Sequence, residues 1–76
     1  GKGYGIDAWN LAISLIFSKK IRKITAGTMS LNYPMLKVFR LSNMKFEYKK
    51  KNQFLYNNNE IDLIGYRIYR NDHKKK

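Results

Sequence analysis

The first regular pattern along the chain is a broad stripe of apolar residues at helical spacing between residues 6 and 20. Its members are Ile6, Ala8, Trp9, Leu11, Ala12, Ile13, Leu15, Ile16 and Phe17. Residues that recur every three or four positions line one side of an α-helix. Asp7 near the start and Lys20 near the end suit the helix dipole. The pattern therefore predicts a helix over residues 6–20 that lies on a sheet.

A period of two replaces the helical period between residues 22 and 30. Apolar and β-branched residues alternate there with others, which predicts a β-strand. A second helix is predicted directly after it, because Asn32 is a good N-cap and Pro34 fits the first helical turn. The helix is expected to end near Asn43, since asparagine tolerates the positive φ that follows a helix C-terminus.

The last part of the chain predicts a hairpin. Residues 45–56 and 60–70 are rich in aromatic and branched residues, and the run Asn57-Asn58-Asn59 between them suits a tight turn. Polar residues interrupt the alternation over residues 49–53, so a bulge or a loose segment is expected there. The predicted order is helix, strand, helix, strand, strand, which defines an α+β fold.

The stretch before the first helix has features of a ligand-binding segment. Gly1, Gly3 and Gly5 alternate with Lys2 and Tyr4 and lead straight into the helical stripe. Glycines let backbone amides approach a ligand closely, and a helix N-terminus attracts negative charge. The segment is therefore either an anion-binding loop, suited to a phosphate or pyrophosphate, or a frayed glycine-rich end.

Composition limits the remaining functions. The chain has 76 residues, no cysteine and one histidine, so one small domain without disulfides or thiolate ligands is expected. His73 lies in a lysine-rich stretch and is expected to be solvated. No metal site and no histidine-based catalytic triad are predicted.

The formal net charge of +11 raises the alternative of a small basic nucleic-acid-binding module. The charges occur in separate runs, at residues 19–23, 49–51 and 74–76, which are typical of solvated surfaces. Aromatic residues are interleaved with basic ones in the predicted hairpin, but without the spacing of RNA-binding sheets. Nucleic acid is therefore not the expected partner.

No apolar run reaches the length that spans a bilayer, and no leader sequence with an apolar segment is recognised. A cytoplasmic location without membrane association is expected.

In the order of its predicted elements and in its motifs, the chain resembles the C-terminal half of the proteins of the GNAT superfamily of acyl-CoA N-acyltransferases. The likeness is closest to the branch that acetylates ribosomal-protein N-termini. The cofactor motif of that family is Arg/Gln-x-x-Gly-x-Gly/Ala, and residues 1–5 match all of it except its first position. The resemblance implies that acetyl-CoA is the cofactor. It also implies that its pyrophosphate is held by backbone amides of Lys2, Gly3, Tyr4, Gly5 and Ile6.

A second family motif follows the predicted strand: Asn32, Met35, the pair Val38-Phe39, and Asn43-Met44. By resemblance, Asn32 would hydrogen-bond the pantetheine arm. Many members place a tyrosine at the position of Phe39, where its hydroxyl protonates the leaving thiolate. Phe39 has no such proton, and Tyr33 is a candidate substitute. The catalytic residues are therefore not assigned.

The resemblance implies a partial GNAT fold over residues 1–70, a mixed sheet whose N-terminal strands are missing, followed by a basic disordered tail over residues 71–76. The absent first motif residue implies that the chain begins inside a longer protein. The expected function is acetyl transfer from acetyl-CoA to a primary amine, such as a protein N-terminus, an amino sugar or a small amine. This chain is expected to be the acetyl-CoA-binding half, which on its own lacks a complete acceptor site. Self-association, or pairing with the missing half, is expected to cover the open sheet edge. A non-catalytic acetyltransferase remnant is the other alternative beside the nucleic-acid module.

Overall fold

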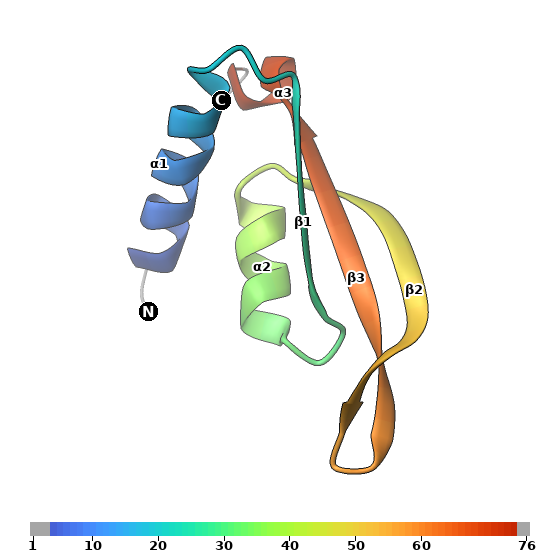
Figure 1. The fold of residues 1–76 in the computed structure, drawn as a ribbon. Helices are drawn as coiled ribbons and strands as arrows, with labels where there is room; N and C mark the ends of the chain where they lie inside the picture. The colour runs from blue at the N-terminus through green and yellow to red at the C-terminus, as the bar shows by residue number, and fades with distance from the viewer. Residues whose placement is uncertain (1–3, 75–76) are drawn as a thin grey trace.

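A computed structural model describes residues 4–74 (Figure 1). The elements follow in the order α1 (Tyr4–Phe17), β1 (Lys23–Met29), α2 (Tyr33–Leu41), β2 (Lys45–Tyr56), β3 (Asn59–Tyr69) and α3 (Arg70–Lys74). The predicted α+β class and the order of helices and strands are confirmed.

The three strands form one sheet in the order β1-β3-β2, with β3 antiparallel to both neighbours. The described strands thus contain no parallel pair, and the mixed pairing expected of the complete family sheet is not formed within residues 4–74. The hairpin turn is as predicted, with positive φ at Asn57 (52°) and Asn58 (64°).

Strand β2 is irregular at two places. The register shifts between Lys50 and Phe54, inside the stretch where a bulge was predicted, and Asn52 there has a φ of 58°. A second shift, between Phe46 and Tyr48, leaves Glu47 as an extra residue and was not predicted. Each extra residue turns the following side chains to the other side of the strand.

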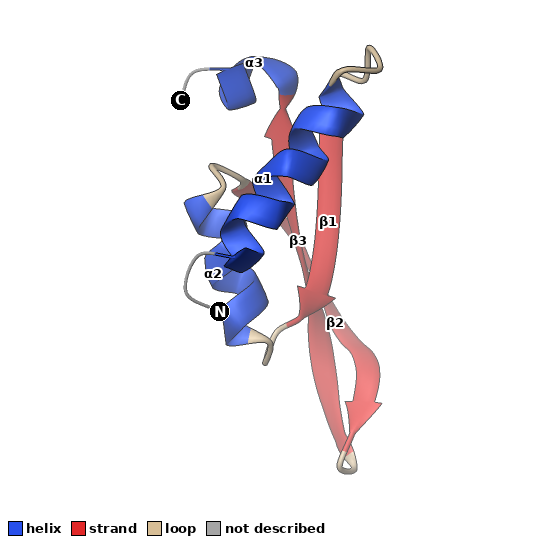
Figure 2. Cartoon of the chain, turned by 90° about the vertical axis from the view of Figure 1, so that its left-hand side faces the viewer, coloured by secondary structure: helices blue, strands red, loops and turns tan. Residues whose placement is uncertain are grey.

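Both long helices cover the same face of the sheet (Figure 2). The core between them and the sheet consists of Ile13, Phe17, Phe39, Met44 and Ile68, each at most 5% exposed. Partly buried side chains from all these layers, such as Trp9 and Tyr66, surround it. The opposite face of the sheet carries none of the described helices.

Helix α1 is shorter than predicted at its C-terminal end. It ends at Phe17, and Lys20, with a φ of 63°, turns the chain toward β1. Only one side of its broad apolar stripe is buried, since Leu11 and Leu15 remain 62% and 58% exposed. The apolar stripe of α1 is thus broader than the surface that the other described elements bury.

The C-terminal stretch corrects two predictions. Residues 70–74 form α3 instead of belonging to a disordered tail that begins at residue 71. The ring of His73 packs 5.6 Å from that of Phe17, and its Nε2 lies 2.9 Å from Ser14 Oγ, so His73 is half-buried and not solvated. Composition indicated a solvated tail, but contacts with the end of α1 hold it in place.

Candidate functional site

The described residues of the predicted anion loop form the first turn of α1. Gly1, Lys2 and Gly3 lie outside the described residues, whereas Tyr4, Gly5 and Ile6 open the helix itself. The first four amides of an α-helix have no acceptor within the helix. The start of α1 therefore presents donors to a ligand, although as a helical turn and not as the loop predicted for Tyr4 and Gly5.

Gly5 fits a site for a closely approaching ligand. Apart from its two chain neighbours and the backbone of its own helix, none of the described residues has an atom within 4 Å of the place where a Cβ on Gly5 would stand. Packing within the described part of the chain thus gives no reason for glycine, which is unfavourable in helices. Open space beside free amides is what a pyrophosphate would need. The carboxylate of Asp7, also in the first turn, is the one negative group that such an anion would meet there.

Asn32 begins α2 and is held by two hydrogen bonds. Its Oδ1 accepts from the amide of Met35 at 3.2 Å, and its Nδ2 donates to Thr28 Oγ1 at 3.1 Å. The side chain is therefore an N-cap, as predicted. One lone pair and one N–H of the amide stay free to serve a ligand, because an asparagine side chain has four hydrogen-bonding positions.

The two long helices begin on the same side of the helical layer, the side toward the β2–β3 hairpin turn (Figures 1 and 2). The end of β1 leads into this region, since Asn32 follows Met29 by three residues. The candidate cofactor residues from Tyr4 to Ile6 and at Asn32 thus lie on neighbouring elements, although more than 25 residues of sequence separate them.

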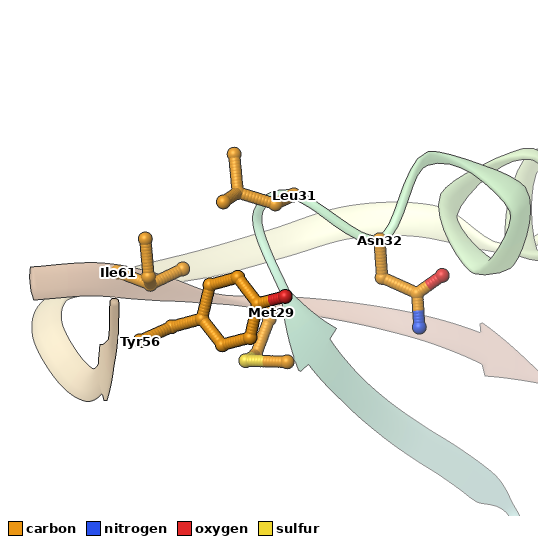
Figure 3. Close-up of a pocket in the computed structure, with 5 residues that line it drawn as sticks. All are labelled: Met29, Leu31, Asn32, Tyr56 and Ile61. Carbon is orange, nitrogen blue, oxygen red and sulfur yellow. The ribbon is translucent and has the colours of Figure 1, made fainter. Parts of the chain in front are cut away.

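An apolar pocket of about 350 Å³ lies beside Asn32 (Figure 3). Its lining comes from the end of β1, the following turn and the β2–β3 hairpin, and consists of Met29, Leu31, Asn32, Tyr56 and Ile61. The Asn32 amide and the Tyr56 hydroxyl are its polar groups. The sequence did not indicate this pocket, because its walls depend on the register of the hairpin against β1.

Phe39 lies in the core and not in an open site. It is 1% exposed, and its ring packs 5.6 Å from Trp9 and 5.3 Å from Tyr66. Tyr33, its proposed substitute, is the first residue of α2 and is 68% exposed. The structure brings Tyr66 next to Phe39, a neighbour that the sequence did not indicate. No catalytic role of Tyr33 follows from these positions.

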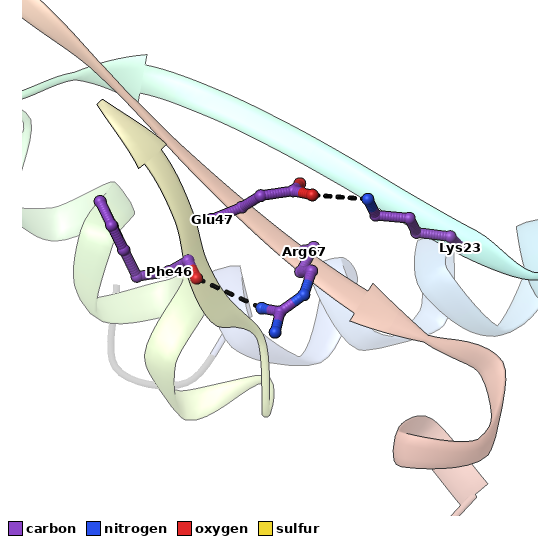
Figure 4. Close-up of polar contacts among 4 residues, drawn as sticks. All are labelled: Lys23, Phe46, Glu47 and Arg67. Carbon is purple, nitrogen blue, oxygen red and sulfur yellow. Dashed lines mark hydrogen bonds and ion pairs between the residues drawn. The ribbon is translucent and has the colours of Figure 1, made fainter. Parts of the chain in front are cut away.

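On the uncovered face of the sheet, two polar contacts join the strands (Figure 4). Lys23 Nζ lies 2.5 Å from Glu47 Oε2, and Arg67 Nη1 donates to the carbonyl of Phe46 at 3.2 Å. The hydrogen bond to Glu47 raises the pKa of Lys23 above its ordinary value. Glu47 reaches Lys23 because the bulge at position 47 turns its side chain to this face.

Among residues 4–74, no group of three or more His, Cys, Asp or Glu side chains is placed to hold a metal ion. In the same range, no helix is both long and apolar enough to cross a membrane.

Comparison with known proteins finds similar solved structures but no matching family model or curated protein. A solved structure named as a probable acetyltransferase matches with a TM-score of 0.86, at 19% identity, over 95% of this chain and 41% of its own. An N-acetyltransferase from Staphylococcus aureus Mu50 gives 0.84 at 23% identity, over 91% of this chain and 42% of its own.

A third structure, named provisionally as a phosphinothricin N-acetyltransferase, gives a TM-score of 0.82 at 22% identity, over 91% of this chain and 44% of its own. The chain therefore has a partial GNAT fold, the fold of N-acetyltransferases, as the sequence resemblance indicated. It spans less than half the length of these structures. The ribosomal-protein branch is not confirmed.

Proposed function

We propose that this chain is the acetyl-CoA-binding part of a cytoplasmic N-acetyltransferase that transfers an acetyl group to a primary amine. One observation carries the proposal: in an acetyltransferase fold, the glycine-containing start of α1 and the Asn32-capped start of α2 lie on the same side of the helical layer. The amine class, whether a protein N-terminus, an amino sugar or a small amine, follows the family resemblance.

The residues of this chain would bind and orient the substrate. The first-turn amides of Tyr4, Gly5 and Ile6, preceded by Lys2 and Gly3, would hold the pyrophosphate, and the free positions of the Asn32 amide would hold the pantetheine arm. Acetyl-CoA supplies an acetyl group activated as a thioester. The pocket beside Asn32 offers an apolar wall for the acceptor.

A non-catalytic remnant is the second candidate, and the burial of Phe39 favours it. The position that supplies a proton donor in many family members holds a phenyl ring that is 1% exposed. Such a chain would bind coenzyme A without turning it over.

We also propose that the free edge of β1 pairs with another strand, from a second copy or from a complementary half. In the described sheet β1 has one neighbour, β3. The other edge strand, β2, is protected by two bulges and several lysines, whereas β1 is regular and carries a single lysine, Lys23. Sedimentation should show self-association, and a folded monomer at high concentration would count against it.

Titration of the isotope-labelled chain with coenzyme A tests the cofactor proposal. We expect saturable shifts of the amide resonances of Gly5, Ile6 and Asn32. No shift at millimolar concentration, in a chain shown to be folded by its dispersed spectrum, would overturn it. Because the chain by itself is expected to lack a complete acceptor site, acetyl transfer to a panel of amines is measured with the complementary half added. It then separates the two candidates, since only the enzyme would turn over.

A further inference from the structure

Basic residues that are scattered in the sequence gather at the end of the sheet where β1 begins and β3 ends. Lys45 lies directly opposite Arg67 in the pairing of β2 with β3, and Lys23 lies opposite Tyr69 in the pairing of β1 with β3. The ring of Tyr69 has Lys23 Nζ and the Arg67 guanidinium each 5.6 Å from its centre. Like charges placed directly opposite each other destabilise a sheet. An anion bound nearby would relieve that repulsion.

A pocket of about 230 Å³ lies in this region, lined by Arg22, Tyr69, Arg70 and Asn71. Two guanidinium groups, a phenol and a carboxamide all offer hydrogen-bond donors, and the lining contains no carboxylate. Within residues 4–74, the one acidic side chain in contact with the neighbouring basic residues is Glu47, which binds Lys23. The positive charge of the lining is therefore not neutralised from within it.

Arg70 is already oriented. Its Nε and Nη2 donate to the carbonyl of Ile21 at 3.0 and 2.7 Å, and its guanidinium lies 5.9 Å from the Phe17 ring. The amide of Arg70 also donates to the carbonyl of Arg22 at 2.9 Å, which fixes the two arginines relative to each other. These bonds use two of the five N–H groups of the guanidinium, so three stay free for a ligand.

We propose that this pocket binds a terminal phosphate group. Guanidinium groups match the oxygens of a phosphate in geometry and charge, and a side chain fixed in advance loses little freedom on binding. The site lies at the C-terminal end of α1, whereas Gly5 lies at its N-terminal end, about 20 Å away along a helix of 14 residues. The proposal does not depend on coenzyme A binding.

Titration with inorganic phosphate at constant ionic strength tests the proposal, with the backbone amides of residues 69–71 and the Arg Nε groups followed by NMR. We expect saturable shifts confined to this region. Arg22→Gln should weaken binding about five-fold or more, because one charge-assisted contact is lost and the exposed side chain of Arg22 leaves the core untouched. Tyr69→Phe, which keeps the ring and removes the hydroxyl, should also weaken phosphate binding, because one hydrogen-bond donor is lost.

Lys37→Gln is the matched control, since it removes one positive charge from the exposed side of α2. It should leave phosphate affinity unchanged. If Lys37→Gln and Arg22→Gln weaken phosphate binding equally, the effect is one of overall charge, and the proposed phosphate site is contradicted. A short single-stranded oligonucleotide that binds while inorganic phosphate does not would also overturn it, in favour of a polyanion surface. A phosphomonoester that shifts the same resonances supports it.

Discussion

The ring of Tyr48 on β2 lies directly over Gly65 on β3. A Cβ at position 65 would stand 2.3 Å from Cε2 and Cζ of that ring and 2.7 Å from Cε1. Gly65 is buried beneath the ring in the middle strand, with Gly27 of β1 as its partner on the other side. The bulge at Glu47 makes this contact, because it brings Tyr48 opposite Gly65. Glycine is thus required at position 65 for space.

Gly65→Ala should destabilise the chain by about 1 to 3 kcal/mol, the usual cost of overpacking. In an open strand the same change would be neutral or favourable, since glycine is a poor strand former. Urea unfolding measures the effect. Gly27→Ala is the control and should cost less, because its Cβ would meet the flexible end of Leu63 at 3.1 Å. Gly65→Ala should cost much less in a Tyr48→Ala background than in the parent chain, and an equal cost in both backgrounds would disprove the ring contact as its cause.

The sequence predicted the elements well because their signals are local. Asn32 with Pro34 located the start of α2, and the asparagine run located the hairpin turn. The bulge at Glu47, and with it the contact between Tyr48 and Gly65, depends on pairing with β3 and has no local signal.

The candidate site was predictable in part for the same reason. The motif residues Gly5 and Asn32 could be named from spacing, but the pocket beside Asn32 and the arginine pocket arise from register between distant strands. His73 was assigned to a tail because its neighbours are lysines, whereas its contact with Phe17 comes from the return of β3 to the end of α1.

Gly5→Ala should have opposite effects on stability and on binding. Alanine favours a helix over glycine by up to about 1 kcal/mol, and open space surrounds the position among the described residues, so the chain should become more stable. The added methyl group should weaken coenzyme A binding, because it would stand where the ligand approaches the amides. Calorimetry of unfolding and of binding measures the two effects.

Ala12→Gly on the exposed side of α1 is the inverse control for that change. It should lower stability by about 1 kcal/mol and leave coenzyme A affinity unaltered. If Gly5→Ala binds coenzyme A as tightly as the parent chain, position 5 does not border the ligand.

The ion pair of Lys23 with Glu47 should make stability depend on pH at the alkaline end. The pKa of Lys23 is raised in the folded chain, chiefly by its hydrogen bond to Glu47. A raised folded pKa means that the contribution is fully present below the ordinary value of 10.5 and is lost as the pH rises through the folded pKa. The effect should be small, since both side chains are partly exposed.

Glu47→Gln should therefore lower the pKa of Lys23 toward its ordinary value, as measured by NMR titration of the Lys23 side chain. Glu60→Gln removes an exposed carboxylate from the far end of the hairpin and should leave the pKa of Lys23 unchanged. Equal shifts in both variants would assign the raised pKa to the overall charge and not to the pair.

Phe39→Tyr should destabilise the chain by about 1 to 3 kcal/mol and should not confer acetyl transfer. Phe39 is 1% exposed among Trp9 and Tyr66, so an added hydroxyl would be buried without a prepared partner. Tyr33→Phe removes a hydroxyl from a residue that is 68% exposed and should change stability little. Urea unfolding and the amine panel measure both properties. A Phe39→Tyr variant that is as stable as the parent and gains turnover would place position 39 at the reacting thioester, because only a hydroxyl that reaches an open site avoids the cost of burial.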